Sequence, residues 1–459
     1  MTHGHKFVAP LSPGSPRRHT RPLWLLAGLL SCWPAFSGTN ALTAADPSTP
    51  VAPVEPLTWP SVPIETGPGP GTERSRALAA WQRANDRVAE FPRGHVDLLK
   101  WEARQPASAA ASPAQRHAPL TLAEALQRSL ALRPGLVAGP DAVPMQQTRL
   151  QSQWADHVRQ VQAAWLAAVL ARERQRIAAD VLDNARVGAE LGRRMVEAGN
   201  WSQARHLREQ LIETRARQAW MIAGLALRVQ TEQLARLIGV WDNAEIRQLV
   251  DRLPDQLPAV PPQVPQQPDA QAQALARWPG LDSQRARLGT VGSLPGLGDW
   301  DAAVEQAGQQ FKNPVPESTA PAPTLQDRRL FNNHRIPEVA RERGALLAEA
   351  TLRRSQVREA EAAMQAYHAL ARLAQDELLV RQRIAEQETL LRYNGMLVST
   401  WDLLAAARDR LSALDEASTA RLVYWQAEAD WRSLIAGGRY AGTQAVTGGD
   451  KGKLSAEGH

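Results

Sequence analysis

A long stretch without proline limits most strongly what this chain can fold into. Residues 146–239 contain no proline, and their apolar side chains recur at helical spacing, for example at Val161, Trp165 and Val169. Proline removes a backbone donor and clashes with the preceding turn, so its absence over this length favours long helices. The stretch is broken once, at EAGNWSQA, where Gly199 is followed by capping residues. The pattern therefore predicts two long helices joined by a tight turn.

The same plan occurs again in the second half. Residues 338–394 and 396–436 have helical periodicity, and the break between them falls in LLRYNGMLVSTWDLL. We expect Gly395 to form a C-cap or a tight turn there, in a turn or left-handed conformation, because glycine adopts positive φ at little cost. Ser399 and Asp402 have the spacing of a capping box that starts the next helix. This break therefore predicts a second hairpin tip.

Both breaks carry a tryptophan. Trp201 follows Gly199 and Asn200 in the first, and Trp401 follows Ser399 in the second. We interpret the two rings as packing anchors of the hairpins in preference to ligand contacts, since large aromatic side chains are most often buried. The repeated arrangement is the strongest sign of organisation in the sequence.

Narrow stripes of alanine and leucine indicate how the helices pack. Leu207 and Leu211 continue the apolar positions of the first repeat, and Leu403, Ala407 and Leu411 form one stripe in the last helix. Such stripes are typical of helices that lie side by side over a great length. We predict a mainly α fold of long antiparallel helical hairpins in two structural repeats, like an α-barrel or coiled coil.

The N-terminus predicts export. Basic residues precede the apolar run LWLLAGLLSCWPAF at 23–36, which is too short to span a membrane as a mature helix. Cys32 is the only cysteine of the chain, and LLSC resembles the lipobox at which bacterial lipoproteins are cut and acylated. Alternatively, Cys32 is incidental and cleavage falls near Ala41 or Ala45. Either reading places the mature chain outside the cytoplasm.

Composition changes along the chain define the expected segments. Stretches rich in proline, glycine or serine bury too little apolar surface to fold alone. The segments are a signal peptide (1–31), a Pro/Gly-rich tether (32–71), an N-terminal helical segment (72–118), a first helical repeat (119–249), a Pro-rich linker (250–271), a second helical repeat (272–438) with an irregular insert at about 288–335, and a disordered tail (439–459).

Charge and motifs exclude several functions. The net charge is +6, but nearly all basic residues are arginines interleaved with acidic residues, which is typical of solvated helix faces and not of nucleic-acid binding. No phosphate loop, HExxH motif or nucleophile elbow is present. The ten histidines are scattered, without the spacing of a helical metal site. We therefore predict neither an enzyme, nor a cofactor, nor a metal site.

Several segments resemble the TolC-like outer-membrane factors of bacterial efflux pumps, in the RND-associated lipoprotein branch. The matching pieces are LTLAEALQRSLALRPGL, AQALARWPGL, QLARLIGVWDNAEIRQLVDRLPDQLPAV, RIPEVARERGALLAEATLRRSQVREAEAAMQAYHAL and the stretch from Leu391 to Gly438. The resemblance covers about two thirds of the chain. PRGHVDLLKWEA also resembles N-terminal segments of the subgroup linked to copper and heavy-metal resistance.

This resemblance implies a homotrimer on the periplasmic side of the outer membrane of a Gram-negative bacterium, lipid-anchored at Cys32. Its partners would be an inner-membrane RND-type transporter and a periplasmic adaptor protein. The hairpin tips would contact the adaptor through Gly199, Asn200, Trp201, Gly395, Ser399, Trp401 and Asp402. Three copies of Asp402 near one axis could form a cation-selective ring of carboxylates, although a plain helix cap explains this residue as well.

The chain departs from the family where membrane strands are expected. Pro134 and Trp201 are 67 residues apart, whereas Pro279 and Trp401 are 122 apart, so the first repeat is shorter. The corresponding region of the second repeat lacks the alternation of a transmembrane strand. We expect the β-barrel strands to be reduced or absent.

Three functions remain open at this level. The first is a passive exit duct for small toxic compounds or metal ions. The second is a barrel-less periplasmic lipoprotein with a structural or adaptor-binding role. The third, a secreted helical enzyme or binding protein, fits poorly because narrow Ala/Leu stripes leave little concave apolar volume.

Overall fold

A computed structural model describes part of the chain, residues 118–289, 295–309 and 324–442. The chain divides into two units, Met1–Val51 and Ala52–His459, and every described residue belongs to the second unit. The predicted signal peptide, Cys32, the tether and nearly all of the N-terminal helical segment lie outside the described residues, as does most of the predicted tail.

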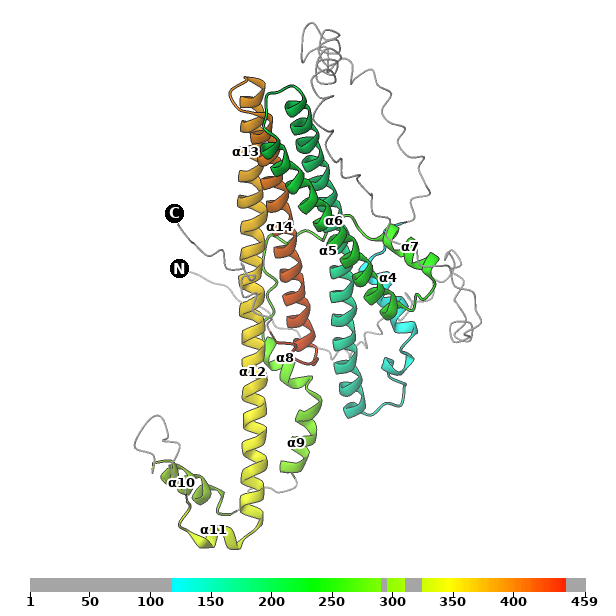
Figure 1. Cartoon of the computed structure of the whole chain (residues 1–459). Helices are drawn as coiled ribbons and strands as arrows, with labels where there is room; N and C mark the ends of the chain where they lie inside the picture. Colours follow the sequence, from blue (N-terminus) through cyan, green and yellow to red (C-terminus); the bar gives the residue numbers. More distant parts are fainter. Residues whose placement is uncertain (1–117, 290–294, 310–323, 443–459) are drawn as a thin grey trace, which may run out of the picture. The chain divides into compact units, whose positions relative to one another are not determined.

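Within these ranges every regular element is a helix, as Figure 1 shows. In chain order the elements are α4 (Leu122–Ala131), the 3₁₀ turn η1 (Pro134–Leu136), α5 (Pro144–Glu197), α6 (Gln203–Ile238), α7 (Asn243–Arg252), α8 (Ala270–Ala276), α9 (Pro279–Gly289), α10 (Leu297–Gly308), α11 (Arg328–Asn332), α12 (Arg335–Leu373), the π-helical turn η2 (Ala374–Leu378), α13 (Leu379–Asn394) and α14 (Thr400–Ile435).

Two long hairpins make up most of the fold. The first consists of α5, with 54 residues, and α6. At 1.5 Å per residue, α5 is about 80 Å long. In the second hairpin α12, η2 and α13 follow one another without a break, and α14 returns beside them (Figure 1). The predicted fold class, mainly α with long antiparallel hairpins in two repeats, is confirmed.

The hairpins meet through their inner helices. α5 packs against both α6 and α14, and α14 packs against both α12 and α13. These contacts link the helices in the order α6, α5, α14 and then α12 with α13. α5 and α14 are covered on two sides, whereas α6 and the α12–α13 helix lie at the edges.

Two apolar cores hold the hairpins together away from their tips. One gathers side chains of α4, α5, α6 and α7, including Val161, Trp165 and Leu234. The other joins α12 and α14 to α8 and includes Met364 and Tyr424. Short helices thus pack beside the ends of α6 and α14 that lie away from the tips.

The structure corrects two expectations about packing. Leu207 and Leu211 were predicted on the packed stripe of the first repeat, but they are 49% and 56% exposed, because α6 has a neighbour on one side only. The insert at about 288–335 was predicted to be irregular, yet it contains α10 and α11. Trp300 of α10 packs edge-on against Phe331 of α11, with ring centroids 5.5 Å apart, and this contact accounts for local order.

None of the helices in the described ranges combines the length and the apolar character needed to cross a bilayer.

Candidate functional site

The turn from α5 to α6 forms the first hairpin tip. α5 ends at the C-cap Ala198, and Gly199 follows in the left-handed region with φ of 75°. The N–H of Gly199 donates to the Val196 carbonyl and the N–H of Asn200 donates to the Met195 carbonyl, both at 2.9 Å. This pair of bonds is a Schellman motif, which satisfies carbonyls at the end of the helix.

The second tip has the same Schellman turn, but its glycine lies one residue before the left-handed position. Gly395 is the C-cap with φ of −80°, and Met396 takes the left-handed conformation with φ of 58°. The N–H groups of Met396 and Leu397 donate at 2.9 Å to the carbonyls of Tyr393 and Arg392. The prediction that Gly395 forms a C-cap is confirmed, and the left-handed conformation, the other possibility at this turn, is taken by Met396. The hydrogen bonds that close the turn fix its register, and they place Met396 where the first tip has Gly199.

Each tip ends in a serine that caps the next helix, three residues after the left-handed position. In the first tip, the Ser202 hydroxyl accepts from the N–H of Arg205 at 3.4 Å. In the second, the Ser399 hydroxyl accepts from the N–H of Asp402 at 3.3 Å, while the Asp402 carboxylate accepts from the N–H of Ser399 at 2.8 Å. The predicted capping box of Ser399 and Asp402 is confirmed. The hydrogen bond from the Ser399 hydroxyl lowers the pKa of Asp402.

Contact between Trp201 and Trp401 joins the two tips. Their ring centroids are 4.1 Å apart, and the Arg205 guanidinium lies 4.1 Å from the Trp201 centroid and 5.9 Å from the Trp401 centroid. A cation over an aromatic face adds an attraction of about 0.5–1 kcal/mol at exposed sites. The two rings therefore pack against each other, and both tips lie at the same end of the molecule.

Gly192 of α5 makes room for this cluster. A β-carbon at this position would meet His206 Nδ1 at 3.1 Å and the Trp201 ring at 3.2 Å, so any larger residue would push both side chains away from α5. The sequence did not single out Gly192 or Arg205. A glycine within a helical pattern was the available signal, because it often marks close packing.

The second tip also exposes two large apolar side chains. Met396 is 93% exposed and Leu397 is 77% exposed, the two highest values among the large hydrophobic residues of the described ranges. Their counterparts in the first tip are Gly199 and Asn200. A non-glycine residue with positive φ costs about 1–2 kcal/mol, and such strain is concentrated at functional sites. The second tip therefore exposes an apolar surface formed by Met396 and Leu397, which the sequence analysis did not single out.

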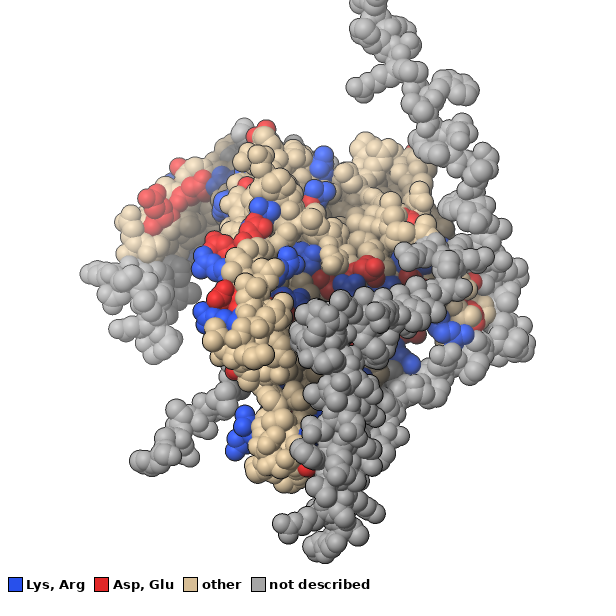
Figure 2. Space-filling model, turned by 90° about the horizontal axis from the view of Figure 1, so that it is seen from above, with Lys and Arg blue, Asp and Glu red and all other residues tan. Residues whose placement is uncertain are grey.

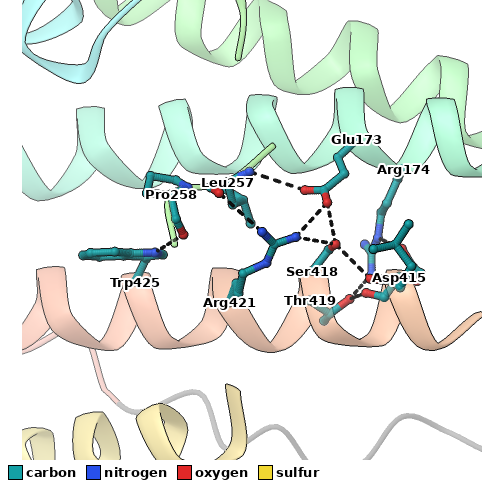
Figure 3. Close-up of polar contacts among 10 residues, drawn as sticks. Glu173, Arg174, Leu257, Pro258, Asp415, Ser418, Thr419, Arg421 and Trp425 are labelled. Carbon is teal, nitrogen blue, oxygen red and sulfur yellow. Dashed lines mark hydrogen bonds and ion pairs between the residues drawn. The ribbon is translucent and has the colours of Figure 1, made fainter. Parts of the chain in front are cut away.

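Below the tips, a buried ion pair joins the two repeats (Figure 3). Glu173 of α5 is 1% exposed, and its carboxylate accepts from Arg421 at 2.8 Å and from the Ser418 hydroxyl at 2.7 Å. The Leu257 N–H donates to the same carboxylate at 3.4 Å, and the Leu257 carbonyl accepts from Arg421 at 3.4 Å. The network therefore attaches the Pro-rich segment to both α5 and α14.

Neighbouring contacts extend this attachment on both sides (Figure 3). Trp425 donates its indole N–H to the Pro258 carbonyl at 2.9 Å. Arg174, the residue after Glu173, donates to Asp415 at 2.8 Å and to the Thr419 hydroxyl at 2.7 Å. The inner helices are thus held together by polar contacts along the same faces.

Acidic and basic side chains lie beside one another on the molecular surface. Figure 2 shows this mixing on one face. Many pairs are one helical turn apart, such as Arg392 with Glu388 at 3.0 Å and Arg193 with Glu190 at 2.8 Å. The Arg193 hydrogen bond is the main cause that lowers the pKa of Glu190 to about 2. The charges form solvated helix faces, in agreement with the sequence pattern.

No cluster of three metal-binding side chains occurs among the described residues. His157, His206 and His368 are buried between helices, and His368 bonds to the Pro261 carbonyl at 2.8 Å. His157 bonds to the Ser129 hydroxyl at 3.1 Å, and burial lowers its pKa. These contacts are those of structural histidines.

No family model matches the chain, and no curated protein matches it in sequence. Among solved structures, it is similar to CusC, studied for folding and transmembrane channel formation, with 13% identity and a TM-score of 0.44 over 69% of this chain and 92% of that chain. It is also similar to the outer-membrane channel OprN, with 19% identity and a TM-score of 0.45 over 69% and 72% of the two chains. For the CmeC outer membrane channel of Campylobacter jejuni, the identity is 11% and the TM-score 0.44, over 65% and 66%.

Proposed function

We propose that this chain is a TolC-like exit-duct component of a tripartite efflux system in a Gram-negative bacterium. It works as a homotrimer and serves as a passive conduit for small toxic compounds or metal ions. A lipid on Cys32 anchors it to the outer membrane on the periplasmic side, and its partners are an RND-type inner-membrane transporter and a periplasmic adaptor protein.

One observation carries this proposal: two hairpins of great length bring two tips of the same turn geometry to one end. Each tip has a Schellman turn, a left-handed residue and a serine cap three residues later. The contact of Trp201 with Trp401 makes the two tips one unit. A globular enzyme has no need for such an arrangement, whereas a protein that meets a partner end to end requires it.

The tips are the proposed contact surface for the adaptor. Asn200, Met396 and Leu397 are exposed there, while Trp201 and Trp401 hold the two turns together. Gly199, Gly395, Ser399 and Asp402 shape the turns that present these side chains. The buried centre of an interface is more apolar than its rim and methionine is enriched there, so Met396 and Leu397 are the expected centre of the contact.

The decisive experiment changes the apolar tip and measures transport. In a strain that lacks the gene, we expect the wild-type chain to restore ethidium efflux. At matched protein level and matched helical circular dichroism, the double variant Met396→Ser/Leu397→Ser is expected to lose it.

Val137→Ser/Val143→Ser is the matched control. Both valines are 60% exposed and lie in the connection that precedes α5, away from the tips. Full efflux by the tip variant would contradict the proposal, as would a purified chain that stays monomeric at high concentration in detergent.

A second candidate is a periplasmic lipoprotein that binds adaptors or has a structural role without forming a conduit. The short connection between α4 and α5 favours it, because the described residues there contain only the single turn η1. It predicts that Cys32→Ser releases the whole chain into the periplasmic fraction. A Cys32→Ser chain that remains embedded in the outer membrane would exclude this candidate.

A further inference from the structure

The methionines of the described chain differ widely in how much solvent reaches them. Met396 is 93% exposed and Met145 is 52% exposed, whereas Met364 is fully buried. Met195 and Met221 are half-buried. An oxidant has to reach the thioether sulfur, so the susceptibility of a methionine follows its exposure. Met396 is therefore the methionine of these ranges that an oxidant reaches most easily.

The turn that carries Met396 is closed by main-chain hydrogen bonds. Its N–H donates to the Tyr393 carbonyl, and the N–H of Leu397 donates to the Arg392 carbonyl, both at 2.9 Å. The Met396 side chain takes part in neither bond and is almost fully exposed. A chemical change at its sulfur would therefore alter the surface of the tip without opening the turn.

Packing within the chain does not explain a methionine at this position. Met396 has φ of 58°, a conformation that side chains disfavour, and the first tip has Gly199 there with φ of 75°. The Met396 side chain covers almost none of its surface against the rest of the chain. Beyond apolar surface, methionine offers a polarisable sulfur that accepts oxygen. The chemistry of this sulfur therefore distinguishes the second tip from the first.

We propose that Met396 is a site of reversible oxidation, which hydroperoxides convert into methionine sulfoxide. A lone pair of the sulfur attacks the terminal oxygen of the peroxide, and the O–O bond breaks as the S–O bond forms. The proton of the transferred oxygen passes to the leaving hydroxide or alkoxide. The sulfur thus loses two electrons, and the peroxide is reduced to water or an alcohol. A thiol-dependent methionine sulfoxide reductase returns the two electrons and releases the oxygen as water.

Oxidation makes the apolar tip polar. The sulfoxide oxygen accepts hydrogen bonds, so covering it with an apolar partner surface carries a desolvation penalty. This consequence rests on the proposed function, in which Met396 and Leu397 form the centre of the adaptor contact. We expect the sulfoxide to weaken that contact about tenfold. The assembled contact covers Met396, so the oxidant acts on chains that have not yet bound their partner.

Peptide mass spectrometry tests the oxidation site. The purified full-length chain is treated with hydrogen peroxide, samples are quenched with catalase, and sulfoxide is measured over time at each methionine. The exposures of 93% and 52% predict that Met396 is oxidised about twice as fast as Met145, which lies at the opposite end of α5 from the tip. Met364 should stay unmodified while the chain is folded. Oxidation of Met396 no faster than that of Met145 would overturn the proposal.

Treatment with a reductase tests the reversal. Incubation of the oxidised chain with methionine sulfoxide reductases of both stereochemical types and dithiothreitol should remove the added oxygen from Met396. The helical circular dichroism should be the same before oxidation, after it and after reduction, because the turn does not depend on this side chain. Sulfoxide that persists at Met396, or a loss of helix on oxidation, would overturn the proposal.

Efflux tests the consequence in cells. In the strain that lacks the gene, each chain is induced with and without a sublethal concentration of hydrogen peroxide, so that new copies meet the oxidant before they assemble. At matched protein level, we expect peroxide to remove most ethidium efflux from the wild type but little from Met396→Leu, which is apolar and has no sulfur. Met145→Leu is the matched control and should lose as much efflux as the wild type. Equal losses in the wild type and Met396→Leu would overturn the consequence.

The double variant Met396→Ser/Leu397→Ser separates this inference from the proposed function. If that variant keeps full efflux, the tip contact and the effect of oxidation on it are both wrong, and the mass spectra still decide whether Met396 is the oxidation site. If that variant loses efflux while peroxide affects the wild type and Met396→Leu equally, only the inference is wrong and the duct proposal stands.

Discussion

The left-handed residue of the second tip offers the sharpest test of how this tip is built. Met396 has φ of 58° where the first tip has Gly199. Replacing it by glycine relieves a strain of about 1–2 kcal/mol. Glycine also adds conformational freedom to the unfolded chain, which lowers the free energy of unfolding by about 0.4–1 kcal/mol. The Met396 side chain is 93% exposed and loses almost no burial, so we expect Met396→Gly to stabilise the tip by about 1 kcal/mol.

Hydrogen exchange of the Leu397 amide reports this change locally. Its N–H bonds to the Arg392 carbonyl at 2.9 Å and closes the turn. A gain of about 1 kcal/mol corresponds to roughly fivefold slower exchange. The same substitution should weaken adaptor binding, because it removes an apolar anchor while leaving the turn more stable.

Gly395→Ala is the control that separates the two glycine positions. Gly395 has φ of −80°, and a β-carbon there would meet nothing closer than the Arg392 carbonyl at 3.5 Å, an ordinary contact. We expect Gly395→Ala to leave the exchange of the Leu397 amide unchanged or slower. Faster exchange in this variant, or in Met396→Gly, would refute the assignment of the left-handed residue.

Three further predictions concern buried and paired carboxylates. Glu173→Ala leaves Arg421 buried without its partner and should lower the free energy of unfolding in urea by about 3–5 kcal/mol. The double variant Glu173→Leu/Arg421→Met should recover most of this loss. Burial raises the pKa of Glu428, so its carboxylate opposes folding at pH values above about 4.5. Glu428→Gln should therefore raise Tm more at neutral pH than at pH 4.5. Equal gains in Tm at the two pH values would contradict this prediction. The pKa of Glu190 is lowered to about 2, so the stability that this carboxylate adds to the fold is present above about pH 4.5 and lost as the pH falls toward 2. Arg193→Gln should raise the pKa of Glu190 in an NMR titration. An unchanged pKa would exclude the Arg193 ion pair as the cause of the shift.

The long helices could be predicted because their signals are local. Helical periodicity and the absence of proline placed α5 and α6, and the Ser399–Asp402 spacing gave the start of α14. The register of the second tip was not predictable in this way. Gly395 marked the turn as a C-cap, as the structure shows, but it did not indicate that the bonds that close the turn would put Met396 in the left-handed position, against its intrinsic preference.

The sequence patterns could not predict contacts between residues that lie far apart in the chain. Glu173 is 84 positions from Leu257 and 248 from Arg421, and no periodicity links them. The apolar stripe of α6 was visible as a pattern, but a pattern shows only that a face is apolar and not which surface covers it. The helical spacing of Leu207 and Leu211 therefore did not predict that both side chains are exposed. The role of the tip residues in partner contact stays a prediction.

The distribution of polar and apolar contacts across the layer suggests why the chain needs both kinds. The inner helices α5 and α14 meet around the Glu173–Arg421 pair. A buried polar pair favours one register of two packed helices over the others, whereas a purely apolar seam of alanine and leucine specifies it less strictly, and a slip by one turn would separate Trp201 from Trp401. The outer helices have apolar stripes without such a buried pair. Within the described residues, the buried pair therefore lies at the centre of the helix layer, and the exposed apolar side chains lie at its edges.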